Sequence, residues 1–144
     1  MSPILDHDSA GYIAFAAYRT AGYPLFIRLV GLDNVVLAQM ALLGISAGLL
    51  GRSVTRYCGK SWFGILTVVA IYGNPLVVPY IAHVRTEILF ISLVSLFLAA
   101  ALMYLRKPST IWAICASVCV GLACITRPQG YPLIIVLGGL KWLA

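Results

Sequence analysis

Long apolar runs separated by short polar breaks constrain this chain more than any other feature of its sequence. A helix that spans a bilayer needs about 20 mostly apolar residues, with about 17 as the lower limit. Runs of that length occupy residues 34–51, 61–82, 88–105 and 109–126, and a further run begins at residue 131. The chain is 62% hydrophobic and only 10% charged, which leaves too few polar residues for the surface of a soluble domain. The sequence therefore predicts an all-α fold, a polytopic transmembrane helical bundle.

The runs differ in features that predict how they pack. Small residues lie on one side of the first run, where they would admit a neighbouring helix: Gly44, Ala47, Gly48 and Gly51. Pro75 and Pro79 lie in the second run, and because proline lacks a backbone donor we expect a kink or a helix end there. The last run, 131–144, reaches Lys141 before it attains the length of a span.

Basic residues in the connections predict the orientation of the runs, because Lys and Arg collect on the cytoplasmic side of a membrane. Alternate connections carry most of them: Arg52, Arg56, Lys60, Arg106 and Lys107, with Lys141 on the same side. The opposite connections carry only Arg85 and Arg127. Residues 1–33 are therefore predicted to lie outside. The net charge of +6 forms no basic face, so we expect no nucleic acid partner.

This orientation places every acidic residue and both histidines on the outer face. The set is Asp6, His7, Asp8, Asp33, His83 and Glu87, together with Arg19, Arg28, Arg85 and Arg127. Ionisable groups near the hydrocarbon are costly unless they are paired or used, so the mixture indicates an external polar site. The two histidines are too isolated for a metal motif, and the cysteines have no CxxC spacing, so neither set predicts a metal site.

The external stretch 1–33 predicts two short helices at the membrane interface. Asp8 or Ser9 caps the first, which runs to about Arg19, and Gly22 suits its C-terminal end. Pro24 suits the first turn of the second, which continues through Leu29. Aromatic residues of the kind found at headgroup depth occur throughout this stretch: Tyr12, Phe15, Tyr18, Tyr23 and Phe26.

Three short motifs follow one another along the chain. They are DSAGY with YRTAGYPLF at 8–12 and 18–26, RTEILF at 85–90, and TRPQG at 126–130. The first resembles the first external loop of the GT-C fold membrane glycosyltransferases, the relatives of protein mannosyltransferases and of the bacterial aminoarabinose transferase and RgtA/B/C/D-like enzymes. The second is similar to that family's TE-x-L-F opening of a later span, and the third to its RP-x-G turn.

The resemblance implies a GT-C-like fold and transfer of a sugar from a polyprenyl-phosphate donor to a glycan, lipid or protein acceptor outside the membrane. It implies that Asp8, four residues before Tyr12, is the catalytic residue. Residues that would bind substrate are Asp6, Tyr12, Arg19, Arg85, Glu87 and Arg127. By the same resemblance Glu87 shapes the acceptor or metal region, so no cofactor is certain and a divalent metal stays an open alternative. Arg127 or Arg85 would face the donor phosphate.

Each of these residues also has a plainer interpretation. Asp8 is equally suited to cap a helix, and Asp6 is its competitor for the catalytic role. Glu87 suits an ion pair with Arg85 or Arg19, or the positive end of a helix dipole. Arg127 suits the lipid headgroups, and the aromatic residues of the external stretch suit a membrane belt better than a sugar platform.

The family has a helix before the external loop and several after the last run of this chain. We therefore expect an internal piece of such an enzyme, or the product of a broken gene, in a bacterial inner (plasma) membrane, inactive when isolated. Two rival hypotheses are a transporter or channel subunit and a non-catalytic membrane assembly protein that uses the Gly44/Gly48 face. The first is less favoured because the charges lie at the ends of the runs and not within them.

Overall fold

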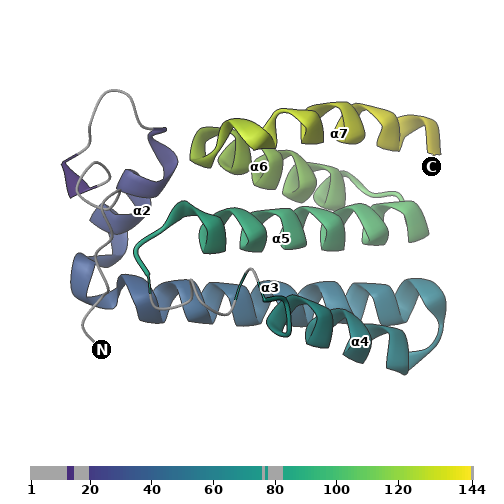
Figure 1. The fold of residues 1–144 in the computed structure, drawn as a ribbon. Coiled ribbons are helices and arrows are strands. Elements are labelled where there is room, and N and C mark those ends of the chain that lie inside the picture. Colours follow the sequence, from purple (N-terminus) through teal and green to yellow (C-terminus); the bar gives the residue numbers. More distant parts are fainter. Residues whose placement is uncertain (1–12, 15–19, 76, 78–82, 144) are drawn as a thin grey trace.

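The computed structural model describes residues 13–14, 20–75, 77 and 83–143, and this part of the chain contains helices and no strand (Figure 1). In chain order they are α2 (Gly22–Val30), η1 (Leu32–Asn34), α3 (Val35–Cys58), α4 (Ser61–Tyr72), α5 (Thr86–Arg106), α6 (Thr110–Thr126), η3 (Pro128–Gly130) and α7 (Pro132–Leu143). The all-α prediction is confirmed for these residues.

The long helices lie side by side, and α5 is their centre. It packs against α3 on one side and α6 on the other, and α7 contacts both α6 and α5 (Figure 1). Helix α4 folds back along the second half of α3, and α2 lies across the end of the molecule where α3 and α5 begin. The beginnings of α3 and α5 and the end of α6 therefore share one end of the bundle.

Two helices are long and apolar enough to cross a membrane. One is α3 with its 3-10 entrance, Leu32–Cys58, and the other is α5, Thr86–Arg106. At 1.5 Å per residue, α5 extends about 30 Å, which is the thickness of the hydrocarbon core of a bilayer. Helices α4 and α6 are apolar but shorter.

Helix α3 extends beyond the apolar run that predicted it. The run ends at Gly51, yet the helix continues through Arg52 and Arg56 to Cys58. Polarity alone does not end a helix. Helix α3 ends at Gly59, whose φ of 73° is a left-handed conformation that favours glycine. The N–H of Gly59 donates to Thr55 O at 2.9 Å.

Helix α4 is shorter than the predicted span of residues 61–82. It ends at Tyr72, and Gly73 donates its N–H to Val69 O at 2.7 Å. Pro75 follows, and because a proline disfavours helical backbone in the residue before it, the helix cannot pass Asn74. The expected helix end near the prolines is confirmed, whereas the expected length of the helix is wrong.

Helices α3 and α4 cross on the small residues of α3. A Cβ added to Gly51 would lie 2.9 Å from Gly64 O, and one added to Gly44 would lie 2.9 Å from Tyr72 Oη. Gly48 has open space instead. The predicted close approach of a neighbouring helix is therefore confirmed at Gly51, where the near atom is backbone, while Gly44 is covered by the Tyr72 hydroxyl.

One of the two short helices predicted for residues 1–33 is confirmed as a helix. Pro24 lies in the first turn of α2, as expected, but Gly22 begins this helix instead of ending an earlier one. A Cβ on Gly22 would lie 2.7 Å from Thr126 Oγ1, so glycine is needed where α2 approaches the end of α6. The first predicted interfacial helix lies outside the described residues.

Candidate functional site

Two of the sequence motifs meet where α5 begins and α6 ends. Glu87 lies in the first turn of α5, and Arg127 is the first residue after α6. Because α5 and α6 run antiparallel through a short connection, the beginning of one lies beside the end of the other (Figure 1). The packing of the bundle therefore brings the TE-x-L-F and RP-x-G segments together.

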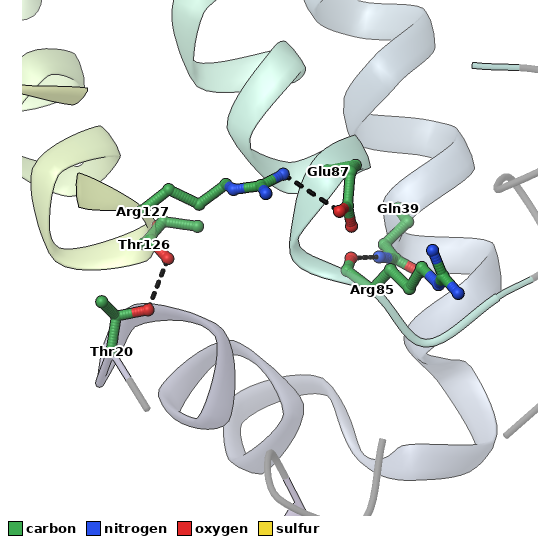
Figure 2. Close-up of polar contacts among 6 residues, drawn as sticks. All are labelled: Thr20, Gln39, Arg85, Glu87, Thr126 and Arg127. Atoms are coloured by element: carbon green, nitrogen blue, oxygen red, sulfur yellow. Dashed lines mark hydrogen bonds and ion pairs between the residues drawn. The ribbon is translucent and has the colours of Figure 1, made fainter. Parts of the chain in front are cut away.

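The contact between the motifs is an ion pair. Arg127 Nη1 lies 3.1 Å from Glu87 Oε1, and the two side chains are 29% and 30% exposed (Figure 2). Pairs of this exposure contribute about 0.2–1 kcal/mol to stability, so the pair matters more for position than for folding. The structure gives Glu87 a partner that sequence reasoning missed, since we expected Arg85 or Arg19.

The glycine of the RP-x-G segment, Gly130, packs closely against α6. Arg127 has extended backbone, and Pro128 to Gly130 form η3. A Cβ on Gly130 would lie 2.7 Å from Ala123 C and from Cys124 N, so only glycine allows this turn to fold back against α6. The turn thereby fixes the backbone from which the Arg127 side chain extends toward Glu87.

Gln39 is a buried polar residue that the sequence interpretation missed. Its side chain is fully buried, and Nε2 donates to Tyr23 Oη and to the carbonyl oxygen of Arg85, both at 2.9 Å. It thus joins α2, α3 and the segment that leads into α5 (Figure 2). An amide in the interior of an apolar run was the signal that could have found it. Its Oε1 accepts no hydrogen bond in the described part of the chain.

Thr20, in the segment before α2, is attached to the same place. Thr20 Oγ1 donates to the carbonyl oxygen of Thr126 at 2.6 Å (Figure 2). Thr126 Oγ1 in turn donates to Leu122 O at 2.7 Å within α6. A residue of the YRTAGYPLF motif therefore lies beside the residue that precedes Arg127.

Arg85 contributes its backbone to this arrangement. Its carbonyl oxygen accepts from Gln39, and Figure 2 shows its side chain directed away from the Glu87–Arg127 pair. Arg85 is half-buried. The structure therefore brings Glu87 and Arg127 together and places the Arg85 guanidinium elsewhere at the same end.

An apolar groove of about 400 Å³ opens between α2, α5 and α6. The groove extends to Thr126, next to Arg127. Apolar side chains line it, among them Leu25, Phe26, Leu29, Leu89, Leu93 and Leu122. The site therefore combines an ion pair with an apolar surface. The other predicted site residues, Asp6, Asp8, Tyr12 and Arg19, lie outside the described residues.

Residues 20–75, 77 and 83–143 contain no group of three or more His, Cys, Asp or Glu side chains placed to hold a metal ion.

Comparison with known proteins adds no family assignment. No family model, no curated protein and no solved structure matches this chain.

Proposed function

We propose that this chain is part of a polytopic GT-C-like membrane glycosyltransferase, which transfers a sugar from a polyprenyl-phosphate donor to an acceptor on the non-cytoplasmic side. The observation that carries the proposal is the Glu87–Arg127 ion pair. It joins two of the three motifs, and the Thr20 hydrogen bond attaches the third at the same end of the bundle.

The distribution of charge supports the sidedness of this site. Arg52 and Arg56 lie in the last two turns of α3, Lys60 follows this helix, and Arg106 ends α5, so these residues lie toward the end of the bundle opposite to Glu87 (Figure 1). Positive charge collects on the cytoplasmic side of membrane proteins. This distribution supports our proposal that the ion pair lies on the outer side, and the proposed location of the enzyme is a bacterial inner membrane.

Exposed apolar side chains support burial of the shorter helices in lipid as well. One face of α6 carries such side chains along its whole length: Ile111, Ile114, Val118, Leu122 and Ile125. An apolar stripe of this length is unfavourable in water and favourable against acyl chains. This supports more membrane spans than the two that length alone identifies.

The chemistry of the site suits a lipid-linked phosphate donor. A guanidinium has five N–H donors in a fork that matches phosphate, and Glu87 engages only Nη1 of Arg127. The groove beside Thr126 offers an apolar surface for the start of an isoprenoid chain. Arg127 would hold the phosphate at the mouth of this groove, and Glu87 would fix the orientation of Arg127.

In the proposed reaction the acceptor hydroxyl attacks the anomeric carbon of the sugar. Asp8 accepts the hydroxyl proton, and the bond between the anomeric carbon and the phosphate oxygen breaks. The electron pair of that bond goes to the departing polyprenyl phosphate, whose charge Arg127 stabilises. The carboxylate of Asp8 therefore acts as the general base, and Arg127 stabilises the charge of the leaving phosphate.

The test is transfer of labelled sugar from a polyprenyl-phosphate donor in membranes that contain the chain together with any in-frame flanking spans of its gene. Asp8→Asn is expected to lower the rate at least 100-fold, since a positioned general base contributes about 10²–10⁴-fold. Asp33→Asn, a change of an exposed acid at the same end, is the matched control. Unchanged transfer by the Asp8 variant would contradict the proposed role, and absence of any transfer would contradict the function.

The structure weakens the rival hypothesis of a non-catalytic membrane assembly protein. The Gly44/Gly48 face was its predicted contact surface, but Tyr72 of α4 already covers Gly44. No observation in the described residues favours a transport pathway, since Glu87, Arg127 and the cationic residues lie at the ends of the helices.

A further inference from the structure

A second groove lies at the opposite end of the molecule, between α3 and α4. The two helices meet most closely where Gly51 faces Gly64, and a groove of about 410 Å³ lies beside this crossing. Its lining includes Gly48, Arg52, Thr55, Ile65, Val68 and Val69. A Cβ added to Gly48 would meet nothing within 4 Å, so the floor of the groove is open at that point.

Cationic side chains surround the shallow end of this groove. Arg52 lines it, Arg56 lies one turn further along α3, and Lys60 precedes α4. All three are exposed, and none has an ion-pair or hydrogen-bond partner among the described residues. Arg52 and Arg56 are four residues apart on one helix, where like charges repel. The described acids, Asp33 and Glu87, lie at the other end of the bundle.

The direction of the helices orders these features along the groove. Helix α3 runs toward the cationic end and α4 runs away from it, so Thr55 and Ser61 are shallow and Gly48 and Val69 are deep. The groove thus has Arg52 between Gly48 and Thr55, Arg56 and Lys60 beyond its shallow end, and apolar side chains toward its deep end. An occupant must carry negative charge at one end and a flexible apolar chain at the other.

We propose that this groove binds an anionic glycerophospholipid, with its phosphate at Arg52, Arg56 and Lys60 and one acyl chain along Gly48, Ile65 and Val69. A free phosphate would leave the apolar floor unused, and an apolar helix of another protein would leave the cations without a counter-charge. The lipid satisfies both parts. This site is at the opposite end from the proposed catalytic site and does not depend on its function.

The experiment measures lipids that remain bound to the purified chain. The chain is reconstituted in nanodiscs that contain phosphatidylglycerol and phosphatidylcholine, and the lipids retained after transfer to mild detergent are counted by native mass spectrometry. We expect selective retention of phosphatidylglycerol. Arg52→Gln is expected to lower it about fivefold, because one basic residue near an anionic surface contributes about that factor. Arg106→Gln removes an exposed charge at the same end but outside the groove, and is expected to retain the lipid.

A second pair of variants tests the apolar floor without a change of charge. Gly48→Leu fills the open space in the groove, and Gly121→Leu adds the same side chain at an exposed position of α6 that is equally open. Loss of phosphatidylglycerol with Gly48→Leu alone supports the site. Equal retention of phosphatidylcholine, or equal retention of phosphatidylglycerol by all four variants, would overturn it. Dimers in place of bound lipid would assign the groove to a second copy and overturn it as well.

Discussion

At the scale of single residues, Glu87 and Arg127 are the pair on which the site depends. Each side chain is about 30% exposed, so a substrate can reach both, yet each limits the conformations of the other. A partly exposed pair of this kind contributes little to the free energy of unfolding. In the proposed reaction the pair orients the remaining N–H groups of Arg127 toward the donor phosphate.

The first prediction separates stability from activity at this pair. Glu87→Gln is expected to change the free energy of unfolding by about 1 kcal/mol or less, because the pair is partly exposed. Sugar transfer is expected to fall about tenfold or more, because Arg127 loses its orientation. Thermal unfolding in detergent and the transfer assay measure the two effects. A matched loss of transfer in Asp33→Asn would show that charge at this end, and not the pair, is responsible.

The second prediction concerns Gln39. Replacement by Leu would remove the donor that Gln39 gives to the buried Tyr23 hydroxyl and to the part-buried carbonyl oxygen of Arg85. A buried group that loses its hydrogen bond costs about 1–3 kcal/mol, so Gln39→Leu is expected to lower the free energy of unfolding by that amount. Denaturation of the purified variant measures it. Ser117→Ala, which removes an exposed hydroxyl bonded within α6, is the control and is expected to be nearly neutral.

At the scale of elements, close helix approaches depend on glycine. Gly22, Gly64 and Gly130 each leave no room for a Cβ, and they fix α2 on α6, α4 on α3, and η3 on α6. The sequence indicated the first-run glycines as a contact surface, and the structure shows α4 as their partner. The extent of α4 was less predictable, because an apolar run does not reveal where the backbone stops being helical.

The third prediction tests the α3–α4 crossing. A Cβ on Gly64 would collide with Thr55 Oγ1 and with Gly51 O, so Gly64→Ala is expected to destabilise the fold by about 1–3 kcal/mol. Gly121 is also a helix-interior glycine but has open space around it. Gly121→Ala is expected to be neutral or up to about 1 kcal/mol stabilising, through helix propensity alone. Unfolding of both variants in the same detergent provides the comparison, and equal stability would contradict the close contact.

At the scale of the whole molecule, charge divides the bundle into two ends. The cationic residues in and after the last turns of α3 and α5 lie toward one end, and the Glu87–Arg127 pair lies at the other (Figure 1). Both proposals depend on this division, since the polar site needs the outer surface and the lipid groove needs the cytoplasmic one.

The fourth prediction tests this orientation with a native cysteine. Cys58 is exposed at the end of α3. In a variant with Cys115, Cys119 and Cys124 replaced by alanine, we expect Cys58 to react with a membrane-impermeant maleimide only after the membrane is permeabilised. A cysteine substituted for Asp33 in place of Cys58 is expected to react without permeabilisation. The reverse labelling would place the ion pair in the cytoplasm and contradict the proposed function.

The sequence by itself determined the helical class, a helix end near the prolines of the second run and the unequal charge of the two ends of the runs. These depend on local chemistry: apolar side chains over the length of a helix, prolines that lack a donor, and the distribution of Lys and Arg. Tertiary structure alone decided that Arg127 is the partner of Glu87, that Gln39 holds the backbone of Arg85, and that α4 covers Gly44. Such contacts follow from the rotation and offset of each helix against its neighbours, which many small packing interactions set together and no single stretch of sequence encodes.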